Sequence, residues 1–419
     1  MEVSASPTRD PERKARQSRR RLATGLVAVV VASTGWWVAS QAQEGEQWLP
    51  SQPLVEGRRV FEEKHCSSCH GVPGDPNAER IGPDLGRQRA WQDVMQLAGS
   101  FWNHTPAMLE RMRERGIERP TLSSDDMRKL AAYLFYLNFL DEPGDVGRGR
   151  ALFEERSCTR CHQLGGHGGT AGPRLDELKP YASSLFLAQA LWNHGIEMSG
   201  KMKELQLDRP RLEGNDVADI VAFMRADAQP AAPLQPVAAE AGSPRAGRML
   251  FQQKRCIECH AIAGSGGTIG PDLGLRRPMR HVSEVAGALW NHGPIMWAKM
   301  KDRHIAFPYL SDRDMSDLLA YLYFVQYVGG GGDAQKGAAV FRDKHCAQCH
   351  AAAGAGPKKG PDLAASKALA SPADWAAAMW NHAPAVDQAL RETQAPWPRF
   401  DDDEMRDLVV FLRSGTAGK

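Results

Sequence analysis

The eight cysteines of this 419-residue chain fall into four pairs, and no other feature constrains the fold as much. Each pair has the spacing Cys-x-x-Cys and is followed directly by a histidine. The first cysteines of successive pairs lie 92, 98 and 90 residues apart. Self-similarity at so long a period predicts four similar domains in tandem. No cysteine remains for a structural disulfide.

The Cys-x-x-Cys-His pattern is typical of a c-type haem attachment site. Each thiol can form a thioether with a haem vinyl group, and the histidine is then directed at the iron as proximal ligand. A redox-active dithiol or half of a zinc site would explain one pair, but four pairs that use every cysteine make both unfavourable. We therefore expect four covalently attached haem c groups, held by Cys66, Cys69, Cys158, Cys161, Cys256, Cys259, Cys346 and Cys349, with proximal ligands His70, His162, His260 and His350.

The N-terminal region predicts a membrane attachment. Residues 1–21 form a basic segment that we expect to stay cytoplasmic, and the apolar run 22–40 is long enough for a transmembrane anchor. A cleaved signal peptide is the alternative, because Ser40-Gln41-Ala42 offers small residues at the spacing of a cleavage site. Either interpretation exports the remainder of the chain. The sequence thus predicts a single-pass protein of the cytoplasmic (inner) membrane, with its haem domains in the periplasm or on the outer face.

The charge is unevenly distributed along the chain. The formal net charge is +2, but residues 1–21 alone carry seven bases and three acids, so the exported part is slightly acidic. The only basic cluster flanks the apolar run, and nothing in this pattern favours binding to nucleic acid.

Each repeat carries the same landmarks around its haem motif. Nine residues before the first cysteine stands a glycine, with a phenylalanine four residues later, which predicts a helix that another helix approaches closely. After the motif comes Gly-Pro-x-Leu, and we expect the proline carbonyl to orient the proximal histidine. A Trp-Asn-His triplet follows, and then a capped helix with a buried aromatic residue. The Gly-x-x-x-Phe helices have Gly57, Gly149, Gly247 and Gly337, and the Gly-Pro-x-Leu motifs begin at Gly82, Gly172, Gly270 and Gly360. The triplets begin at Trp102, Trp192, Trp290 and Trp380, and the buried aromatic residues of the last helices are Tyr133, Phe223, Tyr321 and Phe411.

Taken together, each repeat resembles a class I cytochrome c domain. The resemblance implies an all-α fold around one haem and a role in one-electron transfer. We expect domains at 48–142, 145–228, 245–328 and 333–416, called units one to four below, with a Pro/Ala-rich linker at 229–244. The short connection between units one and two predicts that these two pair more securely than units three and four, which Gly329 to Gly332 join.

The resemblance also implies a methionine as the sixth iron ligand, opposite the proximal histidine. The first three units each offer two methionines after the triplet, and the second of each pair matches the family pattern better. The favoured candidates are Met112, Met202 and Met300; the alternatives are Met108, Met198 and Met296, or the triplet histidines His104, His194 and His292. Unit four has Val386 and Leu390 instead, so His382 is its candidate ligand unless that haem is five-coordinate.

The leading hypothesis is an electron carrier rather than an enzyme. It would relay electrons between respiratory or other redox proteins, or to a membrane oxidoreductase complex. An enzyme with an open fourth haem, or a cytochrome subunit of a larger complex, are the alternatives. The sequence contains no phosphate-binding glycine motif and no second metal signature.

Overall fold

The computed structural model describes residues 53–72, 81–86, 91, 93–141, 143–226, 242–274, 281–325, 331–357, 359–401 and 403–415. The basic segment 1–21, the predicted anchor 22–40 and most of the predicted linker lie outside the described residues. None of the helices within the described ranges is long and apolar enough to cross a membrane.

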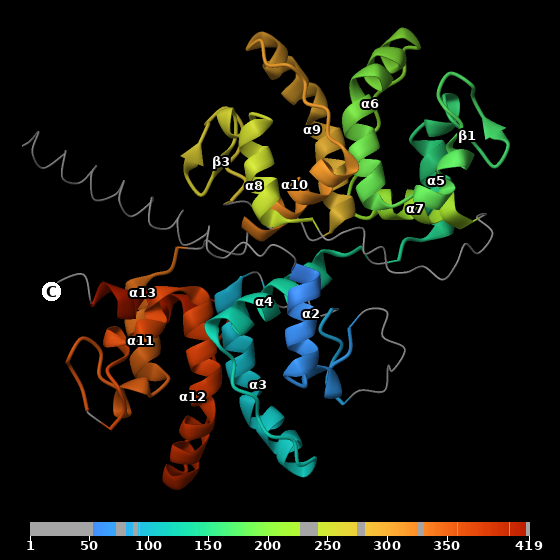
Figure 1. Ribbon diagram of the computed structural model, residues 1–419. Coiled ribbons are helices and arrows are strands. Elements are labelled where there is room, and N and C mark those ends of the chain that lie inside the picture. The colour runs from blue at the N-terminus through green and yellow to red at the C-terminus, as the bar shows by residue number, and fades with distance from the viewer. Residues whose placement is uncertain are drawn as a thin grey trace, which may run out of the picture.

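Each unit consists of three α-helices, so the expected all-α fold is confirmed (Figure 1). A short first helix leads into the haem motif, a long second helix carries the Trp-Asn-His triplet, and a third helix closes the unit. These are α2 (Pro53–Glu63), α3 (Val94–Glu114) and α4 (Ser124–Phe139); α5 (Val146–Glu155), α6 (Ser184–Glu204) and α7 (Asp216–Ala226); α8 (Pro244–Gln253), α9 (Val282–Asp302) and α10 (Asp312–Phe324); and α11 (Ala334–Asp343), α12 (Pro372–Thr393) and α13 (Glu404–Ser414).

Two-residue strands form small antiparallel hairpins after the haem motifs of units two and three. In unit two β1 (Gln163–Leu164) pairs with β2 (His167–Gly168), and in unit three β3 (Ala261–Ile262) pairs with β4 (Ser265–Gly266). Unit four keeps a single bridge between Ala352 and Ala355 at the same place. These hairpins shape the loop between the haem motif and Gly-Pro-x-Leu.

The first and third helices of each unit cross at the glycine predicted for close approach. A side chain at Gly57 would lie 2.3 Å from the carbonyl oxygen of Lys129 and from the Cβ of Tyr133. One turn later, Phe61 packs on Tyr133 with ring centroids 5.7 Å apart. The same aromatic pair recurs as Phe153 with Phe223, Phe251 with Tyr321, and Phe341 with Phe411. The predicted roles of the glycine and the aromatic residue are therefore confirmed.

The four units associate as two pairs, one with four and two with three (Figure 1). In one pair α3 packs against α12, and in the other α6 packs against α9. The sequence had favoured a pairing of units one and two over one of units three and four, but the main helix contacts form neither pair, because linker length does not decide which surfaces are complementary. The two pairs meet through units one and three, where the Tyr323 hydroxyl donates to the Phe135 carbonyl at 2.7 Å.

Candidate haem-binding sites

Each Cys-x-x-Cys segment forms one 3₁₀ turn, η1 (Cys66–Ser68), η2 (Cys158–Arg160), η4 (Cys256–Glu258) and η6 (Cys346–Gln348). The amide of the following histidine donates to the carbonyl of the first cysteine, for example from His70 to Cys66 at 3.0 Å. This turn brings both cysteines and the histidine together. All eight thiols are free of disulfide bonds.

Burial keeps the first thiol of each pair neutral. It raises the pKa of Cys66 to about 12 and those of Cys158, Cys256 and Cys346 to about 11. In a redox-active dithiol, by contrast, the pKa of one cysteine is lowered, which favours the thiolate. The environment of these thiols therefore does not match the dithiol alternative.

The proximal histidines are oriented by the prolines that the sequence singled out. His70 Nδ1 lies 3.1 Å from the Pro83 carbonyl oxygen, and His162, His260 and His350 lie 3.0 Å from those of Pro173, Pro271 and Pro361. A carbonyl only accepts, so Nδ1 carries the proton and Nε2 keeps the lone pair that binds a metal. The predicted role of the Pro carbonyl is confirmed in all four units.

The glycine before each proline makes room for the imidazole. A Cβ at Gly82, Gly172 or Gly360 would lie 2.6 Å from Cε1 of the proximal histidine, and at Gly270 only 2.4 Å. The glycine amide also donates to the second cysteine's carbonyl, at 2.8 Å in every unit. The Gly-Pro turn therefore lies so close to the imidazole that only glycine can stand before the proline. We call this arrangement of turn and imidazole the cradle.

This donor set fits haem c. Each unit presents two unpaired thiols and an imidazole whose Nε2 is available. Burial lowers the pKa of His70, although its bond to the Pro83 carbonyl opposes the effect, so the ring stays in the neutral form that binds iron. The residues that would hold the four haems are thus the predicted cysteines and proximal histidines.

The Trp-Asn part of each triplet has a role that sequence reasoning missed, since it binds the partner unit. In α12, Trp380 Nε1 donates to the Pro120 carbonyl at 2.8 Å. Asn381 next to it donates from Nδ2 to the Leu122 carbonyl at 2.7 Å and accepts from the Leu122 amide at 3.0 Å. The tryptophan itself is buried, with Trp380 only 7% exposed.

The same three bonds occur four times. Each Trp-Asn pair binds a four-residue docking segment of the partner unit, and the two units of a pair do so reciprocally. The docking segments are residues 119–122, 209–212, 307–310 and 397–400, and they bind Trp380-Asn381, Trp290-Asn291, Trp192-Asn193 and Trp102-Asn103, respectively. We call each such contact a clamp. The sequence does contain a pattern that could have predicted the clamps, because Pro-x-Leu or Pro-x-Phe follows each triplet at a similar distance.

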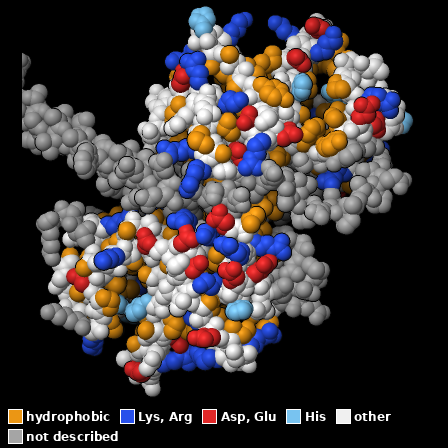
Figure 2. Space-filling view, in the orientation of Figure 1, with side chains coloured by type: hydrophobic (Ala, Val, Ile, Leu, Met, Phe, Trp, Pro, Cys, Tyr) orange, Lys and Arg blue, Asp and Glu red, His pale blue; other side chains and the backbone are white. Residues whose placement is uncertain are grey.

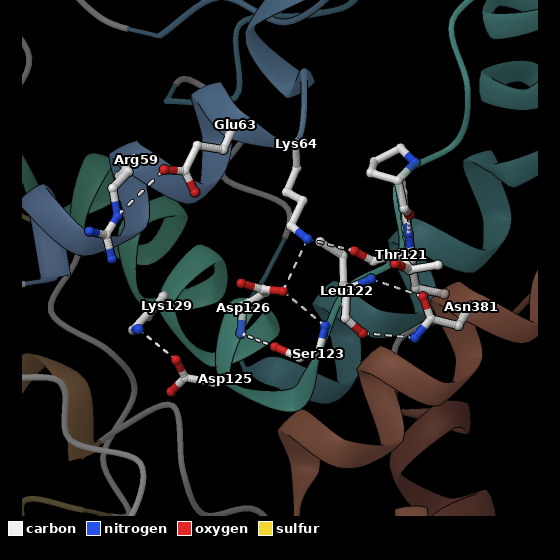
Figure 3. A network of polar contacts seen from close by, with 12 residues as sticks. Arg59, Glu63, Lys64, Thr121, Leu122, Ser123, Asp125, Asp126, Lys129 and Asn381 are labelled. Carbon is white, nitrogen blue, oxygen red and sulfur yellow. Dashed lines mark hydrogen bonds and ion pairs between the residues drawn. The ribbon is translucent and has the colours of Figure 1, made fainter.

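A cation braces the docking segment within its own unit (Figure 3). The Lys64 ammonium, two residues before the haem motif, donates to the Thr121 carbonyl at 2.9 Å and lies 3.2 Å from Asp126. Lys254 does the same in unit three, donating to the Tyr309 carbonyl at 2.9 Å. Haem motif and clamp are thus joined by one network of polar contacts.

The triplet histidines do not all point the same way. In unit four the rings of His350 and His382 are in edge contact, with centroids 5.9 Å apart and planes at 70°. His104 Nδ1 bonds to the Ser100 carbonyl of its own helix at 2.8 Å, and His292 Nδ1 to that of Ala288 at 2.9 Å. His194 lies 3.6 Å from Glu197. His104 also lies near enough to the proximal His70 to contribute to lowering its pKa, after the larger effect of burial.

The candidate methionines lie one and two turns beyond the triplet on the same long helix. Met108, Met198 and Met296 are partly buried against the hydrophobic core, and Val386 packs in the same way in unit four. Met112, Met202 and Met300 are half-buried in the last turn, where their carbonyls accept from the amides of Ile117, Leu207 and Ile305 at 2.9, 2.8 and 2.9 Å. The first methionine of each pair therefore has a packing role that a valine can also fill.

Known proteins resemble this chain in all four units. The sequence model of the family described as Cytochrome c matches residues 54–138, 146–226, 244–325 and 334–416. A stretch of 87 residues is 33% identical to cytochrome c oxidase subunit 2 of Alkalihalophilus pseudofirmus, and it covers 18% of this chain and 24% of that protein. The chain thus matches about a quarter of that relative's length. No solved structure matches the chain.

Proposed function

The chain belongs to the cytochrome c family, whose domains transfer electrons by means of haem, and we propose that this member is a relay of four covalently bound haems serving redox partners on the outer side of a membrane. The observation that carries the proposal is the fourfold cradle in which two thiols, an oriented imidazole and a Gly-Pro turn recur unchanged. A bound haem supplies a one-electron Fe(II)/Fe(III) couple, and the chain supplies its ligands and surroundings.

We assign the sixth ligand to Met112, Met202 and Met300 in the first three units and to His382 in the fourth. The contact between the His350 and His382 rings, whose centroids are 5.9 Å apart, supports the fourth assignment. The two imidazoles are close enough that both could bind one metal ion. Burial, and secondarily His350, lowers the pKa of His382, which favours the neutral ligand form.

Unit four itself supplies the matched variants for testing these ligands. Met112→Leu, Met202→Leu and Met300→Leu introduce the residue that unit four has at position 390; Met108→Val, Met198→Val and Met296→Val introduce its residue at 386. In the ferric protein, each Leu variant should remove about a third of the methionine–iron charge-transfer absorption, whereas each Val variant should leave it intact. The reverse pattern would transfer the assignment to the first methionines.

The assignment also predicts the distribution of potentials. Methionine as sixth ligand raises the reduction potential of haem relative to a second histidine. An equilibrium redox titration should therefore resolve three haems at higher potential and one at lower potential. His382→Met should move the low-potential component upward, and a titration curve in which it does not move would assign the low potential to another unit.

The enzyme alternative requires an open iron in unit four. The closeness of His382 to His350 argues against it, because this imidazole would compete with a substrate for the iron. Carbon monoxide binds only where a ligand position is free, so the reduced protein should show no spectral response to it, and His382→Ala should acquire one. A response in the unmodified chain would favour the enzyme.

We further propose that residues 22–40 anchor the chain in the cytoplasmic membrane, with the haem units in the periplasm or on the outer face. The apolar run in the sequence supports this placement. Extraction of membranes with carbonate should leave the full chain bound, and release into the soluble fraction would instead indicate a cleaved signal.

The outer ends of the long helices offer a charged surface to redox partners. Exposed bases there lie beside acidic side chains (Figure 2), and Arg111 and Lys201 pair with Glu114 and Glu204 at 2.8 and 2.7 Å. The limited similarity to an oxidase subunit supports a second candidate, in which the chain is a component of a larger oxidoreductase complex. Co-purification of integral membrane subunits with the tagged chain would distinguish a component from a free carrier.

A further inference from the structure

Four similar units can be divided into two pairs in three ways, and the chain adopts one with four and two with three. We propose that two positions in each unit select its partner: the residue before the proline of the docking segment, and the residue after the triplet histidine. Two arrangements do not occur: one with two and three with four, and one with three and two with four. Each of the two positions excludes one of these arrangements. This inference does not depend on the proposed function.

The position before the proline divides the units into two types. Units one and two have Arg119 and Arg209, whereas units three and four have Phe307 and Trp397. Each arginine lies over the clamp tryptophan of its partner, with Arg119 3.8 Å from the Trp380 ring centroid and Arg209 3.3 Å from that of Trp290. Each aromatic residue stacks on the other clamp tryptophan, Trp397 on Trp102 at 4.5 Å and Phe307 on Trp192 at 4.8 Å. Every pair thus combines one arginine with one aromatic residue.

The arginines are half-buried at the interface without a compensating charge. Arg119 Nη2 donates to the Trp380 carbonyl at 3.2 Å and Arg209 Nη2 to that of Trp290 at 3.0 Å. Within the described residues, neither guanidinium has a carboxylate partner, and Nε of both lacks a hydrogen bond. A pair of units one and two would enclose two such cations in one interface, where like charges repel strongly because little water screens them. The first position therefore rejects the pairing of one with two, and with it that of three with four.

The position after the triplet histidine distinguishes the remaining two arrangements. In unit two it is Gly195, and a Cβ there would lie 2.7 Å from Cη2 of Trp297 in unit three. Trp297 is held in place by Phe307, whose ring meets it edge-on at 6.0 Å, and by Arg209 at 5.2 Å. The indole of unit three therefore needs a glycine in the partner helix.

Unit one cannot offer that space. Its residue at this position is Thr105, which is 1% exposed and donates to the Phe101 carbonyl at 2.9 Å. Its actual partner, unit four, has Asp387 where unit three has Trp297, and Asp387 lies 3.8 Å from Arg113 of unit one. The threonine thus rejects unit three and accepts unit four.

The glycine position is tested by hydrogen exchange on the full, haem-loaded chain. The Leu212 and Leu310 amides donate to Asn291 and Asn193 across the pair of units two and three. In Gly195→Thr we expect these amides to exchange at least about tenfold faster. The amides of Leu122 and Phe400, in the other pair, should be unchanged. Gly200→Thr is the control in the same helix, since nothing lies within 4 Å of a Cβ at that residue.

A second substitution should restore the pair. Gly195→Thr with Trp297→Asp reproduces the Thr105 and Asp387 combination of the other pair, and Lys203 stands in the place of Arg113. We expect protection of Leu212 and Leu310 to return to within about threefold of the unmodified chain. Unchanged exchange in Gly195→Thr, equal loss in Gly200→Thr, or no recovery in the double variant would each overturn the role of this position.

The arginine position is tested by exchanging the two residue types within one pair. Phe307→Arg places two cations in the interface of units two and three, and exchange at Leu212 and Leu310 should rise about tenfold. Tyr309→Arg is the control in the same docking segment, because that side chain is 66% exposed. Adding Arg209→Phe to Phe307→Arg leaves one residue of each type and should restore protection. If the double variant exchanges as fast as Phe307→Arg alone, the position does not encode partner choice.

Discussion

Each proximal histidine is fixed from two sides, by a proline carbonyl that accepts a hydrogen bond from its Nδ1–H and by a glycine that leaves room for its ring. His260 lies 3.0 Å from the Pro271 oxygen, and Gly270 is the most tightly placed of the four glycines. The direction of Nε2 therefore depends on backbone atoms rather than on a flexible side chain. With haem bound, that arrangement would hold the proposed iron ligand in one orientation.

We predict that Gly270→Ala will disturb one haem of the four. The added methyl group lies within contact distance of the His260 ring, so the imidazole must tilt or the Gly-Pro turn must move. Electron paramagnetic resonance should show one altered low-spin signal or a high-spin signal from about a quarter of the iron. Gly200→Ala adds the same methyl group in open space, and its spectrum should match that of the unmodified chain. Identical spectra for both variants would remove the cradle role.

For single residues, the sequence allowed predictions where the same motif occurs in all four units. Cys-x-x-Cys-His and Gly-Pro predicted the thiols, the proximal ligands and the orienting carbonyl, because these contacts are local in the chain. The orientations of His104 and His382 were not predictable. Identical triplets differ there in their neighbours: His104 bonds to the Ser100 carbonyl of its own helix, whereas His382 contacts His350 from the haem motif.

The third helices of units one and three, α4 and α10, each begin at a capping box. Ser123 and Asp126 form a reciprocal capping box at α4, with both bonds 3.0 Å long, and Ser311 with Asp314 repeats it at α10. Burial alone would raise the pKa of Asp126, but hydrogen bonds from Ser123 and the Lys64 ammonium outweigh it and lower that pKa. The start of α4 is thus tied to the haem motif through Lys64.

We expect Ser123→Ala to destabilise unit one by about 1 kcal/mol, the usual effect of removing a helix N-cap. Urea unfolding followed by circular dichroism measures this change. Ser124→Ala is the control, because Ser124 lies one residue inside the helix and is not the cap. Equal midpoints for the two variants would show that the box contributes nothing.

The same box predicts a pH dependence. Since the folded pKa of Asp126 is lowered, its contribution to stability is present above its unfolded pKa and is lost as the pH falls through the folded value. The stability difference between the unmodified chain and Asp126→Asn should therefore shrink as the pH falls below about 4. A difference that stays constant between neutral and acidic pH would contradict the assignment.

Elements were predictable because their signals are short-range. The Ser-x-x-Asp boxes and the Gly-x-x-x-Phe helices could be interpreted within one unit. The length of α3, α6, α9 and α12 was harder to foresee, because Pro106, Pro294 and Pro384 lie inside three of these helices. Packing between units stabilises these helices despite the interruption.

At the scale of the whole molecule, the clamps make the two units of a pair interdependent. Asn381 satisfies both backbone groups of Leu122, and Asn103 does the same for Phe400. The sequence did not predict this pairing, since complementarity between distant segments leaves no periodic pattern. The repeated Trp-Asn was visible, but its partner lies about 260 to 300 residues away in units one and four.

We predict that Asn381→Ala will destabilise both units one and four, by roughly 1 to 3 kcal/mol, because it leaves the Leu122 amide and carbonyl without partners. Gln388→Ala in the same helix is the control, since that side chain is exposed and bonds only within α12. Hydrogen exchange should show faster opening in both units of the pair. A loss of protection confined to unit four would mean that the units unfold independently.

We propose above that the chain holds four haems, each of which takes up and releases one electron. Coulometric titration of the purified chain, with the haem content fixed by its denatured intact mass, measures both quantities. We expect a polypeptide carrying four covalent haems and a reversible uptake of four electrons, three at higher and one at lower potential. A mass with fewer haems, or an uptake of fewer than four electrons, would show that this relay is not formed.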